Sequence, residues 1–161
     1  MTVRIRDFQP DDAPAFAALN LAWIDEIFEV EPSDRAQLED PQSAIIAKGG
    51  RIAIAEIDGR VCGCGAVLPA HIQPVPDKYY VEIVKMAAAE DMRGRGIGRA
   101  VLDRLIEDAR EMGADGIWLE TSNKLAAAQH LYRTSGFRDL DDDAFWPTPY
   151  GRCNAQLVLE L

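Results

Sequence analysis

The sequence is poor in cysteine and histidine, and it has fewer basic than acidic side chains. Its 161 residues include three cysteines, two histidines, and 17 lysines and arginines against 27 acids, for a net charge of −10. Cys62 and Cys64 lie two residues apart and Cys153 is remote, a spacing that fits neither a disulfide framework nor a zinc site. An odd, small number of cysteines is typical of a reducing compartment, so we expect a cytoplasmic protein.

The acidic balance and the lack of long apolar runs argue against several kinds of partner. Non-specific nucleic-acid binding and docking to anionic membranes both depend on Lys and Arg, which are in deficit here. No segment approaches the roughly 18 apolar residues of a membrane-spanning helix, and Arg4, Arg6 and Asp7 leave no apolar region for a signal peptide. His71, in a Pro-rich loop, and His130, on a solvated helix face, suggest no metal site. We therefore expect no nucleic acid, no membrane and no metal.

What the sequence does contain is a regular succession of strand and helix patterns. Asp58-Gly59 predicts a hairpin turn, and Gly136 predicts the left-handed end of a helix. Hairpins together with helical crossovers indicate an α/β fold with a mixed sheet, and the length fits a single domain over residues 1–161. The patterns predict strands at 3–8, 51–57, 61–68, 79–88, 116–121 and 156–161, helices at 13–28, 98–112 and 125–134, and a short helix with loops within 32–48.

The segment 93–99 reads Arg-Gly-Arg-Gly-Ile-Gly-Arg and lies between a predicted strand and a predicted helix. Glycines let successive amides point into one concavity, and the start of a helix attracts anions. The segment therefore suits a diphosphate, although a tight turn with solvated arginines explains it as well. It is not a P-loop, because no Lys-Ser or Lys-Thr pair follows, and its glycines are spaced differently from the dinucleotide fingerprint.

Arg93-x-x-Gly96-x-Gly98 resembles the signature of the GNAT N-acetyltransferase superfamily. Glu82-Ile83-Val84-Lys85-Met86 is similar to that family's central strand. Leu119-Glu120-Thr121 and Leu131-Tyr132-x-x-x-Gly136-Phe137 are similar to its fifth strand and the helix that follows. The resemblance covers essentially the whole chain. It implies a mixed central sheet of about six to seven strands, flanked by helices and splayed between strands 4 and 5.

The resemblance also implies a reaction, the transfer of an acetyl group from acetyl-CoA to an amine. The amides of the glycine-rich segment would hold the CoA pyrophosphate, and the end of the central strand would pair with pantetheine. A backbone N–H near Ala88 would face the thioester oxygen. The residues so implied in binding are Met86, Ala87, Ala88, Arg93, Gly94, Arg95, Gly96, Ile97, Gly98 and Arg99.

By the same resemblance Tyr132 is the general acid, because a phenol is protonated at neutral pH and can protonate a leaving thiolate. Core packing is the alternative role for this side chain. Glu82 matches an acidic position that serves as base, directly or through water, and its alternative role is a structural carboxylate paired with an arginine. Glu120 on the neighbouring strand is the second candidate base. An asparagine that contacts pantetheine in many members is replaced here by Leu125, with Asn123 two residues earlier.

The resemblance implies an amine acceptor, either a small molecule or a peptide end. Residues 25–40 contain seven acids and one arginine, and an acidic wall there would favour a cationic acceptor, whereas a solvated helix face would not. A different function is a sensor or interaction protein that binds acetyl-CoA without turnover. The sequence is also compatible with a homodimer.

Overall fold

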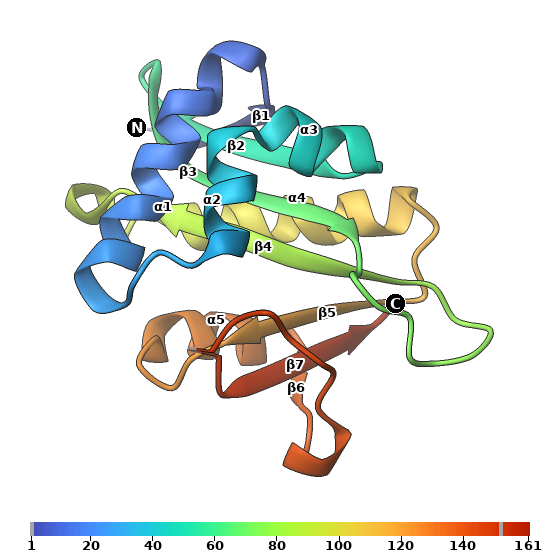
Figure 1. Ribbon diagram of the computed structural model, residues 1–161. Helices are drawn as coiled ribbons and strands as arrows, with labels where there is room; N and C mark the ends of the chain where they lie inside the picture. Colours follow the sequence, from blue (N-terminus) through green and yellow to red (C-terminus); the bar gives the residue numbers. More distant parts are fainter. Residues whose placement is uncertain (1, 152) are drawn as a thin grey trace.

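The structure is a computed structural model that describes residues 2–151 and 153–161, except for the side chains of residues 26 and 27 (Figure 1). The strands are β1 (Arg4–Asp7), β2 (Arg51–Ile57), β3 (Arg60–Pro69), β4 (Tyr80–Ala88), β5 (Gly116–Thr121), β6 (Arg138–Asp139) and β7 (Ala155–Glu160). The helices are α1 (Ala13–Ile27), α2 (Pro32–Glu39), α3 (Pro41–Ala44), α4 (Ile97–Glu111) and α5 (Ala126–Thr134). Short 3-10 turns are η1 (Pro10–Asp12), η2 (Ile46–Lys48), η3 (Glu90–Met92) and η4 (Asp142–Ala144).

These strands form one seven-stranded sheet in the order β1-β2-β3-β4-β5-β7-β6. Only β4 and β5 run parallel, and the other neighbours are antiparallel. The predicted mixed α/β sheet is therefore confirmed. At the predicted hairpin turn both Asp58 and Gly59 have positive φ, as a type I′ turn requires. The strand that the sequence patterns did not predict is β6, which is only two residues long.

The sheet has an apolar core on each face, because the side chains of a strand alternate between faces. In β2, Ile52 and Ile54 join the cluster under α1 and α2, whereas Ala53 and Ala55 join the cluster under α4. Figure 1 shows α1 and α2 on one side of the sheet and α4 on the other. Helix α4 contributes a stripe of apolar side chains, which Val101, Leu102, Leu105 and Ile106 form.

The two parallel strands separate soon after they begin to pair. Only Tyr80, Val81 and Glu82 of β4 are paired with β5, although β4 continues to Ala88. A register shift against β3 falls at the same part of β4, where Lys85 has a φ of 57°. This β-bulge bends the strand, so the structure confirms the predicted splay between strands 4 and 5.

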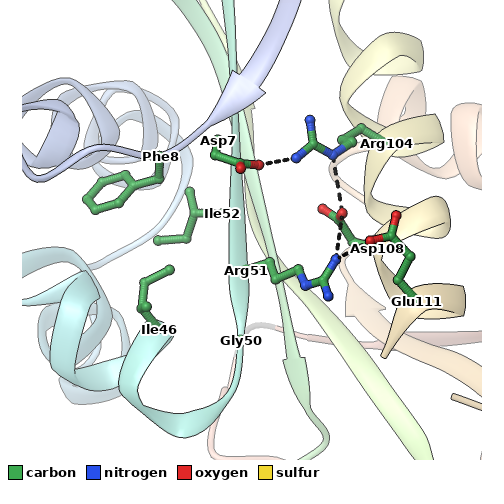
Figure 2. A pocket seen from close by; sticks show the side chains of 9 residues that line it. All are labelled: Asp7, Phe8, Ile46, Gly50, Arg51, Ile52, Arg104, Asp108 and Glu111. Carbon is green, nitrogen blue, oxygen red and sulfur yellow. Dashed lines mark hydrogen bonds and ion pairs between the residues drawn. The ribbon is translucent and has the colours of Figure 1, made fainter. Parts of the chain in front are cut away.

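A cluster of charged side chains ties the sheet edge to the C-terminal part of α4 (Figure 2). The buried Asp108 carboxylate accepts hydrogen bonds through Oδ1 from Arg51 Nη1 at 3.3 Å and from Arg104 Nε at 3.2 Å. Arg104 also pairs with Asp7, and Arg51 with Glu111. These residues line a cavity of about 410 Å³. It lies toward the opposite end of α4 from the glycine-rich turn, and its charges are satisfied mainly by one another.

Candidate active site

The glycine-rich segment is an open turn between η3 and α4. Gly94 and Gly96 have φ values of 80° and 76°, and Gly96 is the N-cap of the helix. A Cβ added at either position would meet no atom within 4 Å. Glycine is therefore required here by the left-handed backbone and not by crowding, because a side chain in that conformation costs about 1–2 kcal/mol.

The amides of this turn form an anion-binding surface. Among the described residues, the N–H groups of Gly94, Gly96, Ile97, Gly98 and Arg99 donate to no backbone carbonyl. The first amides of a helix lack intrahelical acceptors, and the helix dipole places partial positive charge beside them. The three arginine side chains of residues 93–99 are exposed at the same turn. Because donors, dipole and charge coincide here, the turn fits a diphosphate.

Replacing Gly96 with alanine should weaken binding at this turn. We expect the KM for acetyl-CoA to rise about fivefold or more, because an alanine in the left-handed conformation costs about 1–2 kcal/mol or else moves the amides. Steady-state kinetics with acetyl-CoA as the varied substrate measure this. Gly113→Ala is a matched control, because Gly113 has the same positive φ and open surroundings at the far end of α4. Equal KM values in the two variants would contradict the assignment.

The free edge of β4 lies next to the turn. The N–H of Ala89 donates to Cys62 O at 2.8 Å, toward β3. Successive amides of a strand point to opposite edges, so the amide of Ala88 points toward the gap that β5 has left. Ala88 is exposed, and Met86 and Ala87 are half-buried. This strand end therefore offers a backbone donor and small side chains at an unpaired edge.

Tyr132 reaches the same strand from α5. Its ring packs in the core beside Phe137, with centroids 5.9 Å apart, and its hydroxyl lies 3.8 Å from the sulfur of Met86. Burial raises the pKa of the phenol to about 12. The hydroxyl group is therefore protonated throughout the physiological range, and it lies beside the end of β4. Core packing, one of the two roles considered for Tyr132 from the sequence, is observed, and the general-acid role stays a prediction.

Glu82 lies at the point where the strands part, since it is the last β4 residue that pairs with β5, opposite Trp118. Its neighbours Val81 and Ile83 belong to the α4 cluster, so the Glu82 side chain projects from the other face. The buried carboxylate accepts two hydrogen bonds through Oε1, from the His71 amide at 2.8 Å and from His71 Nδ1 at 3.1 Å. Among the described residues, the hydrogen-bond partner of Glu82 is thus a histidine. The structural role considered from the sequence had paired Glu82 with an arginine instead. Glu82 and Tyr132 approach the gap from opposite faces of the sheet.

Comparison with known proteins agrees with this geometry. The model of the acetyltransferase (GNAT) family matches residues 15–137. The chain belongs to this family. A relative named IAA acetyltransferase, from Azospirillum brasilense, is 33% identical over 82% of this chain and 80% of that protein. The chain spans about half the length of several other curated acetyltransferases that it matches.

Solved structures share the GNAT fold over the full chain. A GNAT acetyltransferase from Staphylococcus aureus Mu50 superposes with a TM-score of 0.84 at 19% identity, covering 99% of each chain. The yncA protein of Salmonella typhimurium, solved with its cofactor acetyl-CoA, has a TM-score of 0.72 at 19% identity and covers 99% of this chain and 94% of that one. Family membership and the named relatives confirm the prediction of an N-acetyltransferase enzyme.

The structure also shows which acids of this GNAT chain are structural. Asp34 is buried and accepts from Lys85 Nζ at 2.5 Å, at the bulge of β4. Glu31 accepts from the Gly151 amide at 3.0 Å. The acidic wall predicted from residues 25–40 therefore presents less charge at the surface than the sequence indicates, because Asp34 and Glu31 have partners within the protein. Asp25, Glu29, Glu39 and Asp40 remain exposed, and the side chain of Glu26 lies outside the described part.

Two other predicted candidates have protein partners. Glu120 accepts from Thr148 Oγ1 at 2.6 Å, and it lies near enough to His71 to raise the pKa of that imidazole. Asn123, a candidate pantetheine contact, accepts from Gln129 Nε2 at 3.1 Å. Glu120 therefore lies close to His71, whereas the Asn123 amide oxygen is held by the protein.

Sequence reasoning assigned no role to His71, which the structure places in direct contact with Glu82. The two residues are eleven positions apart across a Pro-rich loop, and no periodic pattern links a loop residue to a strand. Within residues 2–151 and 153–161, no group of three or more His, Cys, Asp or Glu is arranged to hold a metal ion. In the same described part, no helix is both long and apolar enough to span a bilayer.

Proposed function

We propose that residues 1–161 form a single domain that transfers the acetyl group of acetyl-CoA to an amine by direct attack. The observation that carries this proposal is that an open amide turn, an unpaired strand edge, a carboxylate (Glu82) and a phenol (Tyr132) border the part of the sheet where β4 and β5 separate. The turn suits the CoA pyrophosphate, and the edge of β4 suits the amides of pantetheine. The yncA protein, which shares this fold and was solved with its cofactor acetyl-CoA, supports acetyl-CoA as the cosubstrate.

Each site residue has a role in this reaction. The available amides of residues 94–99 and the side chains of Arg93, Arg95 and Arg99 hold the pyrophosphate. The backbone of Met86 and Ala87 pairs with pantetheine. The amide of Ala88 stabilises the charge that builds up on the thioester oxygen, because a fixed N–H donor needs no reorganisation during the reaction.

Glu82 and Tyr132 move the two protons. Glu82, directly or through a water molecule, takes a proton from the acceptor ammonium, so that the nitrogen can attack the acetyl carbon. As the new N–C bond forms and the C–S bond breaks, the attacking nitrogen releases its second proton to water, and Tyr132 gives its hydroxyl hydrogen to the leaving sulfur. Proton exchange with solvent restores both side chains. A base on one face and an acid on the other suit a substrate held in the gap between β4 and β5.

We also propose that the acceptor is cationic, because exposed acids of residues 25–40 outnumber the single arginine of that segment. A panel of amines tests the substrate class, with CoA thiol release measured for cationic and neutral acceptors at low and high ionic strength. We expect the cationic amines to have the higher kcat/KM and to lose that advantage at high salt, since salt screens exposed charges. Equal rates that do not respond to salt would contradict electrostatic selection.

A further inference from the structure

Residues 145–151, here called the strap, lie against the face of the sheet that carries Glu82. The Trp146 ring stacks on Trp118 of β5 with centroids 4.8 Å apart. Other contacts hold the rest of the strap to β5, to β4 and to the N-cap of α2. They involve Thr148 with Glu120, Tyr150 with Lys85, and Gly151 with Glu31. The strap therefore borders the region where the acceptor amine would bind.

His71 joins this strap to Glu82. Its Nδ1 lies 3.1 Å from Glu82 Oε1, and its Nε2 lies 2.6 Å from the carbonyl oxygen of Pro147 in the strap. The Trp118 ring lies beside the imidazole, with centroids 5.3 Å apart. One side chain thus connects the candidate base to the segment that borders the acceptor.

A carbonyl oxygen only accepts hydrogen bonds, so Nε2 donates to Pro147. When Glu82 is ionised its carboxylate also only accepts, so Nδ1 donates as well and the ring is a cation. The hydrogen bond to Glu82, followed by that to Pro147, raises the pKa of His71 to about 9. The charged groups that act on the ring are Glu82 of β4 and Glu120 of β5, and both favour the cation.

The two oxygens of Glu82 are not equivalent. Oε1 accepts from the amide and from Nδ1 of His71, whereas Oε2 accepts no hydrogen bond from the described residues and is not sealed from solvent. We propose that His71 is a positioning residue that, as an imidazolium, holds Glu82 by Oε1 so that Oε2 faces the acceptor amine, and that it ties down the strap through Pro147. This inference rests on the proposed function, because it assigns Glu82 the role of base.

Two substitutions separate the two hydrogen bonds. The amide nitrogen of an asparagine can take the place of Nδ1, so His71→Asn keeps a donor to Glu82 and loses the bond to Pro147. The longer side chain of His71→Gln reaches toward Pro147 and loses the bond to Glu82. We expect His71→Gln to lower kcat about tenfold, and His71→Asn to raise the KM of the amine severalfold with a smaller change in kcat, because a hydrogen bond to a charged group is worth about a tenfold effect or more.

The pH profile distinguishes positioning by a cation from simple packing. The wild-type kcat/KM should fall as the pH rises through about 9, because the imidazolium then loses a proton and one of its two donors. Deprotonation of Tyr132 would not cause this fall, because its pKa is raised to about 12. Neither amide variant has a titrating group at position 71, so both should lack the fall near pH 9.

Nitrogen NMR of the imidazole gives a readout that does not depend on activity. We expect both ring nitrogens of wild-type His71 to stay protonated beyond pH 8, and Glu82→Gln to shift the titration to lower pH. His130→Gln assigns the second histidine signal. Titration of His71 near its ordinary pKa of about 6.5, or pH profiles that the His71 variants leave unchanged, would overturn the inference. A wild-type protein that acetylates no amine would instead contradict the proposed function.

Discussion

Replacing Tyr132 with phenylalanine should lower kcat by about a hundredfold or more, because general acid catalysis contributes roughly 10²–10⁴-fold. The hydroxyl is the group removed, and its contact among the described residues is the Met86 sulfur at 3.8 Å. The ring, its packing against Phe137 and the end of β4 stay as they are. The loss should therefore appear in kcat and leave the KM for acetyl-CoA nearly unchanged. Steady-state kinetics with each substrate varied in turn measure both quantities.

A second conservative change of an aromatic in the same core provides the control for this prediction. Phe137→Leu perturbs the packing of the Tyr132 ring without removing a proton donor. We expect it to lower thermal stability more than Tyr132→Phe does, and to reduce kcat far less. If Tyr132→Phe kept full kcat, the residue would be a packing residue and another group, such as water, would protonate the leaving thiolate.

Replacing Glu82 with glutamine should also lower kcat by about a hundredfold or more, because the amide cannot take a proton from the acceptor. Raising the pH should partly restore the rate, since a larger fraction of the amine is then already neutral. The comparison is made as kcat against pH for the wild type and the variant with one acceptor amine. The substitution should lower kcat less for an acceptor amine of low pKa than for a strongly basic amine.

Glu120→Gln is the matched control, because wild-type Glu120 is a carboxylate on the neighbouring strand, near the same histidine. Glu120 accepts a hydrogen bond from Thr148 in the strap, so its amide variant should mainly change the KM of the acceptor. If Glu120→Gln caused the larger fall in kcat and Glu82→Gln the smaller, Glu120 would be the base.

Most of the fold was predictable because its determinants are local. The alternation of β2, the Asp58-Gly59 turn and the apolar stripe of α4 are patterns within one segment, and the observed boundaries of these elements agree with the predicted ones to within a residue or two. The short strand β6 has no pattern of its own. It exists because Arg138 and Asp139 pair with β7, a contact that depends on the rest of the sheet.

The site was predictable only in part, for the same physical reason. The glycine turn and Tyr132 lie in motifs whose spacing is short enough to recognise in a single chain. The pairing of Glu82 with His71, and that of Lys85 with Asp34, join segments that are far apart in sequence. The inward turn of Asp34 also removes charge that the composition of residues 25–40 assigned to the surface. Net charge is thus a poor guide to the acceptor unless burial is known.

The measurement that tests the central claim most directly is the stoichiometry of one turnover. The wild-type protein is mixed with acetyl-CoA and an amine from the panel, and CoA thiol, acetylated amine and intact protein mass are measured in the same samples. Direct transfer predicts one acetylated amine for each thiol released, with no acetyl group left on the protein. Binding of acetyl-CoA without thiol release, or an acetyl group that accumulates on the protein before reaching the amine, would contradict the account.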